Sequence, residues 1–118
     1  MTKGYEAHQQ RQMTLSAFGK DLARRSKSKC ELSGASGVPL HIYEIPPVTT
    51  DPDPDRCIML SEHVIDQLNK PSQIVPDQWH HLGELVWSEI PAVQIMAHRI
   101  LTHIARQHIW AQDILDEA

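Results

Sequence analysis

The sequence predicts an α+β fold in a single domain, on three observations. Two short segments rich in β-branched and aromatic residues, 38–45 and 56–60, lie on either side of a proline-rich loop, as in a β-hairpin. Apolar residues recur at helical spacing after Pro91 and, more briefly, after Thr14. The chain has 118 residues, of which 41% are hydrophobic, which suits one globular domain with a modest core.

The N-terminal 30 residues divide into an arm and a helix. Residues 1–13 are polar, with Gly4 and three glutamines, so we expect a flexible arm that precedes a single domain over 14–118. Thr14 is a suitable N-cap, and Leu15, Phe18 and Leu22 fall on one face of a helix. That helix should fray near residues 26–29.

The middle of the chain predicts two strands joined by an acidic loop. "SGASG" (33–37) is typical of turns, and "VPLHIYEI" (38–45) is typical of a strand that ends at Pro46 and Pro47. "TTDPDPD" (49–55) is an extended acidic loop. "RCIML" (56–60) then predicts a second, buried strand. The small core of this module should contain five residues: Ile42, Ile45, Ile58, Leu60 and Val64.

The remainder predicts helices, most of them within a helical part over 76–118. One begins after Ser61 and ends at Pro71, and a short one capped by Asp77 runs through residues 85–87. Pro91 suits the first turn of the next helix, with Ser88 as a possible cap. Its apolar stripe continues to Leu115, so we expect one long amphipathic helix.

Charge is distributed unevenly along the chain. Residues 1–30 carry a formal charge of +5 and residues 31–118 carry −9, which gives the net −4. A basic segment on an acidic body could contact a nucleic acid or a second copy of the chain, and four residues would supply the nucleic-acid contacts: Arg24, Arg25, Lys27 and Lys29. The alternative is a solvated helix face with no partner.

Several classes of protein are not indicated by the sequence. No apolar run approaches the ~20 residues of a membrane span, and the N-terminus has no apolar signal segment, so we expect a cytoplasmic protein with Cys30 and Cys57 as free thiols. There is no phosphate-binding glycine loop, no His-Glu-x-x-His and no recognisable Ser-His-Asp arrangement. We therefore expect no enzyme activity and no small-molecule substrate.

A pair of motifs has the spacing of zinc knuckles but lacks most of the ligands. Two Cys-x2-Cys knuckles can hold one tetrahedral zinc ion. Here the first is Cys30-Glu31-Leu32-Ser33, and the second, after the buried strand, runs from Ser61 to Val64. A serine hydroxyl does not ionise near neutral pH and valine is no ligand, so three of four thiolates are missing. We expect no metal and no other cofactor.

These motifs resemble those of PhnA-like proteins, small bacterial proteins named for a phosphonate-utilisation operon. The similarity covers about residues 22–118 and rests on five strings in order: "RRSKSKCELSGA", "LHIYEIPPV", "DRCIMLSEHV", "DQWHHLGELVWSEIPAVQIMAHRIL" and "WAQDILDEA". The resemblance implies a zinc-ribbon-type module at 30–64, with ligand positions at Cys30, Ser33, Ser61 and Val64. Despite the family name, we do not expect this chain to hydrolyse phosphonates, because the several Asp and His ligands of such a site are not evident in the sequence.

The frame is also similar, more distantly, to the treble clef of HNH nucleases. Glu44 stands where that family has the histidine that activates water, and the later metal-binding residues are absent. The resemblance thus implies a frame without nuclease chemistry, which needs a positioned base and an electrophile. A replacement metal site made of Cys30, His41, Cys57 and His63 stays open as an alternative.

The function that we expect is protein binding, through a homodimer or another protein. The broad apolar stripe of the long helix predicts an interface around Met96, Ile100, Ile104 and Trp110. If two of the three tryptophans lie exposed on one apolar patch, an interface is favoured. Nucleic-acid binding through the basic segment is the alternative, and a monomer whose stripe is covered by its own hairpin and first helix is the alternative to the dimer.

Overall fold

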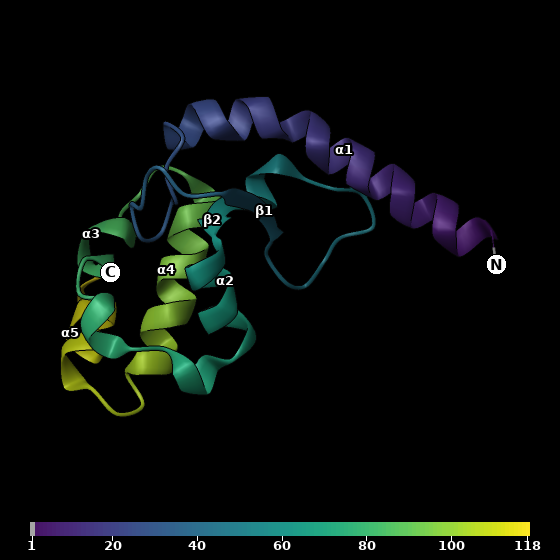
Figure 1. Ribbon diagram of the computed structural model, residues 1–118. Coiled ribbons are helices and arrows are strands. Elements are labelled where there is room, and N and C mark those ends of the chain that lie inside the picture. The colour runs from purple at the N-terminus through teal and green to yellow at the C-terminus, as the bar shows by residue number, and fades with distance from the viewer. Residues whose placement is uncertain (1) are drawn as a thin grey trace.

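Five α-helices and one two-stranded antiparallel hairpin form the architecture of this computed structural model, which describes residues 2–118 (Figure 1). The α+β class predicted from the sequence is therefore confirmed. The hairpin lies between the first helix and the other four, which gather on the opposite side. Among the residues described, no helix is both long and apolar enough to cross a membrane.

Helix α1 (Thr2–Ser26) is longer than the sequence predicted, and it extends away from the rest of the molecule toward its N-terminus (Figure 1). The expected arm over 1–13 is wrong for residues 2–13, which are helical, while Met1 lies outside the described residues. Thr14 is not a cap, because it lies inside the helix and its hydroxyl donates to the Gln10 carbonyl. The high helix propensity of Ala, Gln, Arg and Met outweighs the early glycine.

The second half of α1 is the part that packs against the hairpin. Leu15 and Leu22 are buried there, with Phe18 beside them. Gly19 fits a close approach, because a Cβ at that position would lie 3.8 Å from the Ile42 side chain. The helix ends where Lys27 and Ser28 both adopt φ of 58°, a left-handed conformation that an α-helix cannot continue.

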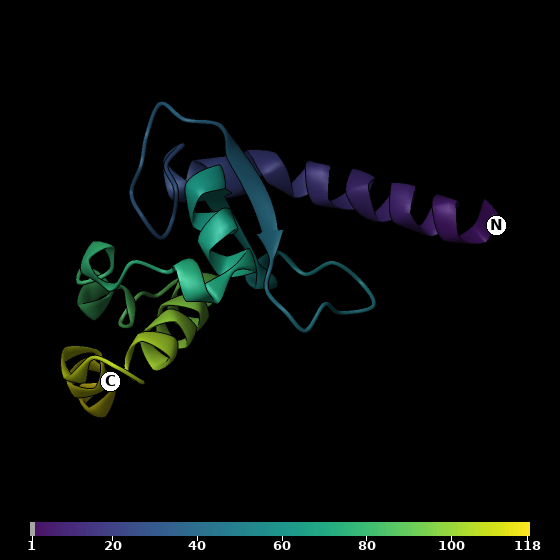
Figure 2. The same ribbon diagram turned by 60° about the horizontal axis from the view of Figure 1, so that its bottom comes forward.

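Strands β1 (Leu40–Glu44) and β2 (Cys57–Ser61) confirm the two predicted strand segments. They pair antiparallel in a register that places Leu40 opposite Ser61 and Glu44 opposite Cys57. Every residue of β2 is buried, because α1 covers one face of the hairpin and the later helices cover the other. The connection between the strands extends away from α4 in both views (Figures 1 and 2).

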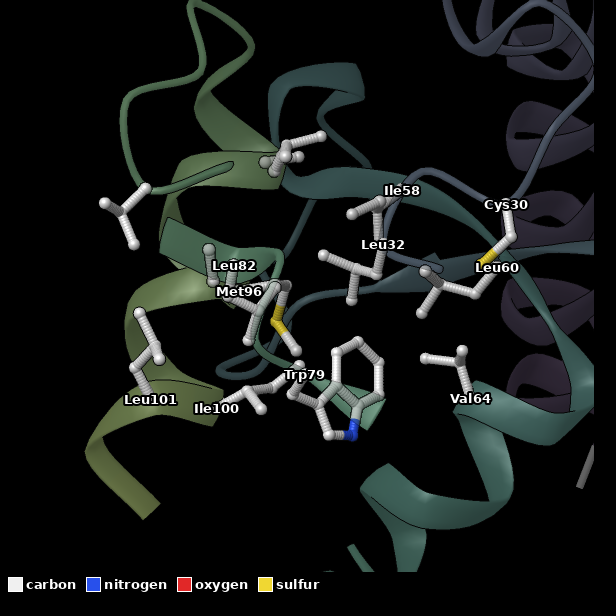
Figure 3. Close-up of a cluster of buried hydrophobic side chains, with 14 of the residues drawn as sticks. Cys30, Leu32, Ile58, Leu60, Val64, Trp79, Leu82, Met96, Ile100 and Leu101 are labelled. Carbon is white, nitrogen blue, oxygen red and sulfur yellow. The ribbon is translucent and has the colours of Figure 1, made fainter. Parts of the chain in front are cut away.

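Alternation along the strands divides the core into two clusters. Ile58 and Leu60 join the larger cluster with Leu32, Val64, Trp79 and Met96 (Figure 3), whereas Cys57 and Met59 join the smaller one beneath α1. Ile45, Ile58, Leu60 and Val64 are buried together, as predicted. Ile42 is the exception, since it pairs with Met59 and faces α1.

Helix α2 (Glu62–Asn69) starts after Ser61 and ends before Pro71, as the sequence predicted. The following segment differs from prediction. Asp77 does not cap a helix: it lies in a single 3-10 turn, Pro76–Gln78, and α3 (Leu82–Leu85) is only four residues long. The buried Trp79, whose indole N–H donates to the side-chain amide oxygen (Oε1) of Gln67 at 3.1 Å, holds this stretch against α2 instead.

Helices α4 (Pro91–Ile104) and α5 (Ile109–Glu117) replace the single long helix that the apolar stripe predicted. The chain turns at residues 105–108, and the two helices pack against each other, burying Ala111. Pro91 occupies the first turn of α4, as expected, and the Ser88 hydroxyl accepts a hydrogen bond from the Ile90 N–H just before it. The stripe is preserved across the turn because both helices contribute to one core.

Candidate functional site

Three of the four positions that resemble zinc ligands, Cys30, Ser33 and Ser61, lie close together, and the fourth, Val64, belongs to the same buried cluster as Cys30. The Ser33 N–H donates to Cys30 Sγ at 3.4 Å, and the Ser61 N–H also acts on this sulfur. Val64 is fully buried in the same cluster as Cys30, which is itself 2% exposed. The two knuckles therefore lie next to each other, with a hydrogen bond on the Cys30 sulfur and a pocket that both Ser33 and Ser61 line.

The electrostatics at Cys30 favour the thiolate more than its burial alone would allow. Burial is the largest effect and opposes ionisation, but the Ser33 hydroxyl and the N–H groups of Ser61, Ser33 and Leu32 together lower the pKa of Cys30. Cys57 behaves in the opposite way, since burial and the nearby Glu44 and Asp53 charges raise its pKa to about 11. The two thiols are free and unpaired with each other.

The replacement metal site of Cys30, His41, Cys57 and His63 is not assembled. Cys30 and Cys57 belong to the clusters on opposite faces of the hairpin. His41 lies 4.0 Å from the Glu62 carboxylate, and His63 contacts the amides of Gln67 and Gln78. Within residues 2–118, no group of three or more His, Cys, Asp or Glu side chains is placed to share an ion.

Glu44, at the position of the HNH histidine, is engaged in an ion pair with α1. The Arg11 guanidinium donates to both Glu44 carboxylate oxygens, with Nε–Oε2 at 3.0 Å, and this hydrogen bonding raises the pKa of Arg11. The same guanidinium donates to the Thr50 carbonyl at 3.0 Å. Arg11 thus joins α1 to the hairpin through Glu44 and to the following loop through Thr50.

The four basic residues predicted for nucleic-acid contact have different environments. Arg25 donates to both oxygens of Glu31, whose side chain is 3% exposed, and to the Cys57 carbonyl. Glu31 in turn accepts from the Met59 N–H at 2.9 Å. Arg25 therefore has a structural role. Of the four basic residues, only Arg24, Lys27 and Lys29 are exposed.

The predicted interface on α4 lies inside the chain. Met96, Ile100 and Ile104 are only 2–3% exposed, so a second copy cannot contact them on this fold. They are covered by the α2–α3 segment, including Trp79 and Leu82, rather than by the first helix (Figure 3). Trp110 is half-buried, with its ring centroid 4.0 Å from that of His80.

The three tryptophans do not form the exposed apolar patch that would favour an interface. Trp79 is 2% exposed and Trp87 is 61% exposed, with Trp110 between them. The large hydrophobic residues that are exposed are scattered over the chain rather than gathered by the tryptophans. Single exposed apolar residues are ordinary on a protein surface.

A groove along α4 is the feature that the sequence did not indicate. Two pockets of about 190 and 450 Å³ adjoin, since Pro71, Ile74 and His103 line both. We call them together the α4 groove, which is lined by Tyr43, Pro46, Leu68, Pro71, Ser72, Ile74, Pro76, Met96, Arg99, Ile100, His103, Ile104, Arg106, Gln107 and His108. It runs from the end of β1, past the segment after α2, to the turn between α4 and α5.

The charge of the α4 groove is opposite to that of the acidic body. Arg99, Arg106, His103 and His108 line it, and no Asp or Glu is among its described lining residues. Arg99 donates to the Pro46 carbonyl at one end, whereas Arg106 at the other end is exposed and has no ion-pair partner within the part of the chain described. Burial raises the pKa of Tyr43, and the nearby Arg99 charge opposes that effect.

One sequence signal could have indicated this surface. Arg99, His103 and Arg106 follow an i, i+4, i+7 spacing, which places cations along one side of a helix and its C-terminal turn. The opposite wall comes from the separate segment around residues 68–76, so no local motif contains the whole groove. Chemically, the groove combines apolar side chains with two arginines, which suits an extended chain that carries carboxylates.

Comparison of the chain with protein-family models, with curated proteins and with solved structures finds no match.

Proposed function

We propose that this protein is a non-catalytic binding module whose α4 groove accepts an acidic polypeptide segment. The observation that carries the proposal is the contrast in charge. Residues 31–118 have thirteen acidic and four basic side chains, yet two of those four, Arg99 and Arg106, line the groove and no described carboxylate does. A groove of one sign on a body of the other attracts and orients an oppositely charged partner.

The apolar residues of the groove support a polypeptide rather than a simple anion. Leu68, Pro71 and Ile74 provide surface for aliphatic or proline side chains, while the arginines can receive carboxylates between them. Apolar burial supplies affinity, and the charges select an acidic sequence and increase its rate of association.

The proposal also takes up the resemblance to PhnA-like proteins, which is compatible with a binding role. In our view the module is a treble-clef-like frame that has lost its zinc, because Ser33, Ser61 and Val64 supply no thiolate. The hydrogen bond from the Ser33 N–H to Cys30 and the burial of Val64 in the same cluster as Cys30 support this view. The frame then serves as a scaffold that presents α4. Glu44 supports the absence of nuclease chemistry, since its carboxylate is bound by Arg11.

Nucleic-acid binding is the competing function. Arg24, Lys27 and Lys29 could meet phosphates, but Arg25 is held by Glu31, which leaves a small basic surface near the end of α1. Salt dependence and the position of the responsive residues separate the two functions, because phosphate contacts weaken steeply as salt rises.

The test is fluorescence anisotropy with three labelled probes: an acidic peptide of Asp, Pro, Val and Leu, the same peptide with Lys in place of Asp, and single-stranded DNA. We expect the acidic peptide to bind and the basic one not to bind. Arg106→Glu should weaken acidic-peptide binding at least about tenfold, since it reverses a charge in the groove. Arg24→Glu is the matched control, because it makes the same charge change on α1, and it should alter binding less than about twofold.

Two results would contradict the proposal. One is failure of the acidic peptide to bind at any concentration tested. The other is DNA binding that Arg24→Glu weakens more than Arg106→Glu does, which would transfer the function to the basic end of α1.

A further inference from the structure

The connection between the two strands is itself an acidic peptide of the kind that the groove suits. Residues 47–55, which we call the acidic loop, contain Asp51, Asp53 and Asp55, with Pro52 and Pro54 between them. Asp51 and Asp55 are exposed, and Val48 is 58% exposed at the start of the loop. A solvent-exposed valine and a row of carboxylates match the apolar base and the cations of the α4 groove.

Contacts within the chain fix the shape of this loop. Arg11 donates to the Thr50 carbonyl, the Thr49 hydroxyl donates to the Asp51 carbonyl, and the Asp55 N–H donates to the Asp53 carboxylate. A loop that is already ordered loses less conformational entropy when it binds. The hydrogen bond from Arg11 holds the loop beside α1, away from the groove of its own chain.

The loop and the groove start from a shared point and extend in different directions. Pro46 lines one end of the groove and directly precedes the loop. From there the loop extends away from α4 in both views (Figures 1 and 2), while the groove follows α4 toward His108. A two-fold axis that passes near Pro46 and bisects these two directions would place the loop of each copy over the groove of the other, in an isologous contact.

We propose that the partner of the α4 groove is a second copy of this chain, whose acidic loop docks in it reciprocally. This inference rests on the proposed function, because it names the polypeptide that the groove accepts. Asp51, near the tip of the loop, reaches the Arg106 end of the partner copy's groove, and Val48 packs on the apolar end. The docked loop would contact the more exposed lining residues, such as Ile74 and Arg106, rather than Met96, Ile100 and Ile104, which line the groove but are only 2–3% exposed.

The dimensions of the two surfaces are compatible. From Met96 to Ile104 the groove follows about 12 Å of helix at ~1.5 Å per residue. A connection of nine residues that leaves and returns to a hairpin can project by up to about 15 Å at ~3.3 Å per extended residue. Two loops bury less surface than a standard interface of ~1,600 Å², so the dimer should be a weak one that dissociates in the micromolar range.

The test is sedimentation equilibrium over about 10–500 µM, the range in which a small interface associates. We expect the average mass of the wild-type chain to rise from monomer toward dimer, and to rise less at high salt because the contact is largely between charges. Arg106→Glu and Asp51→Lys should each weaken association at least tenfold. Arg24→Glu and Glu117→Lys, which make the same charge changes at exposed positions outside the loop and the groove, should leave it unchanged.

Mixing the two interface variants, Arg106→Glu and Asp51→Lys, is the decisive experiment for reciprocal docking. In a mixed dimer the unchanged loop of the Arg106→Glu chain meets the unchanged groove of the Asp51→Lys chain, and the two reversed charges meet each other. Equimolar Arg106→Glu and Asp51→Lys should therefore regain wild-type association, which two misfolded variants cannot do. Circular dichroism checks that each variant is folded before mixing.

The results of these experiments distinguish failure of the second copy as partner from failure of the proposed function. A wild-type monomer mass at every concentration, or a mixture that associates no better than its components, overturns the second copy as partner. If a labelled acidic peptide still binds the groove of that monomer, the proposed function survives and the partner is another protein. If neither loop nor peptide binds, both proposals are wrong.

Discussion

The region around Cys30 and the α4 groove differ in how their polar groups are used. Around Cys30, the Ser33 N–H donates to the sulfur, Val64 is buried in the same cluster, and the neighbouring Glu31 carboxylate accepts from Arg25 and the Met59 N–H. Along the groove, Arg106 is exposed without an ion-pair partner among the residues described, and apolar side chains lie next to it. The first region has the spacing of a motif, but its polar groups already have hydrogen-bond partners. The second region has no motif, but Arg106 there is still available to a partner.

This difference shows why a motif and a functional surface need not coincide. A buried polar group that already has its partners stabilises the fold and has little left to offer a ligand. A cation that faces solvent beside an apolar surface can still gain from a partner. The following predictions test the two halves of this comparison, from the largest expected effect to the smallest.

Restoring the missing thiolates should convert the Cys30 region into a metal site. We expect Ser33→Cys, Ser61→Cys and Val64→Cys together to yield one bound zinc per chain, because Ser33 and Ser61 already lie beside Cys30 and Val64 belongs to the same buried cluster. Structural zinc in such sites is worth about 10 kcal/mol of apparent binding free energy. Elemental analysis by mass spectrometry measures it, with the wild-type chain as control.

That experiment can contradict the account in two ways. A triple variant without zinc would mean that the positions do not converge tetrahedrally. A wild-type chain with about one zinc, lost on Cys30→Ser, would mean that other ligands replace the missing thiolates.

Packing should provide the stability of the hairpin module in place of an ion. Ile58 is 0% exposed in the larger cluster, so Ile58→Ala should lower the free energy of unfolding by about 2–5 kcal/mol. Urea denaturation monitored by tryptophan fluorescence measures the change. Val48→Ala, at an exposed position, should cost less than about 0.5 kcal/mol, and equal losses for the two variants would place Ile58 outside the core.

Alkaline pH should destabilise the fold through Cys57. The thiol ordinarily has a pKa of 9.0, and burial together with the Glu44 and Asp53 charges raises it to about 11 in the folded chain. Between these values the unfolded chain has released the proton that the folded chain retains, so the free energy of unfolding falls as pH rises. The loss across this window should be roughly 2 kcal/mol.

Urea denaturation at a series of pH values from about 8 to 11 measures this fall in the free energy of unfolding. Cys57→Ala should have a shallower pH dependence than wild type. Tyr43, whose pKa is also raised by burial, contributes in the same direction, so Tyr43→Phe serves as the comparison. An unchanged slope in Cys57→Ala would show that the thiol is not perturbed.

Charge reversal in the groove should have the smallest effect on stability. Arg106 is exposed and makes no ion pair within the described residues, so Arg106→Glu should change the free energy of unfolding by less than about 0.5 kcal/mol, as should Arg24→Glu. Glu31→Gln, in contrast, removes the charge that holds Arg25 and should cost several times more. Thermal denaturation ranks the three variants, and a large loss for Arg106→Glu would make Arg106 structural.

The sequence predicted the elements that depend on local chemistry. Both strands were found because Ile42, Tyr43 and Ile58 favour a strand and prolines separate the two segments. The start of α2 after Ser61 and the first turn of α4 at Pro91 were also predicted, because capping and proline preferences act within a few residues.

Long-range packing decided what the sequence did not show. The turn at residues 105–108 contains no Gly or Pro, and it forms where α5 packs back on α4. The burial of Met96, Ile100 and Ile104 depends on Trp79 and Leu82, which precede α4 in the chain. The α4 groove likewise combines three separate segments, so its residues could be recognised only once they were brought together.

The most direct test of the central claim is a dilution series followed by amide nitrogen–proton NMR. If the acidic loop of one copy occupies the groove of another, signals of Val48, Asp51, Ile74, His103 and Arg106 should shift together between about 1 mM and 20 µM, the range of a weak interface. Signals of Lys20, Arg24 and Lys29 on the opposite side of the hairpin should stay in place. Shifts confined to those basic residues, or a spectrum that does not change with concentration, would contradict the account.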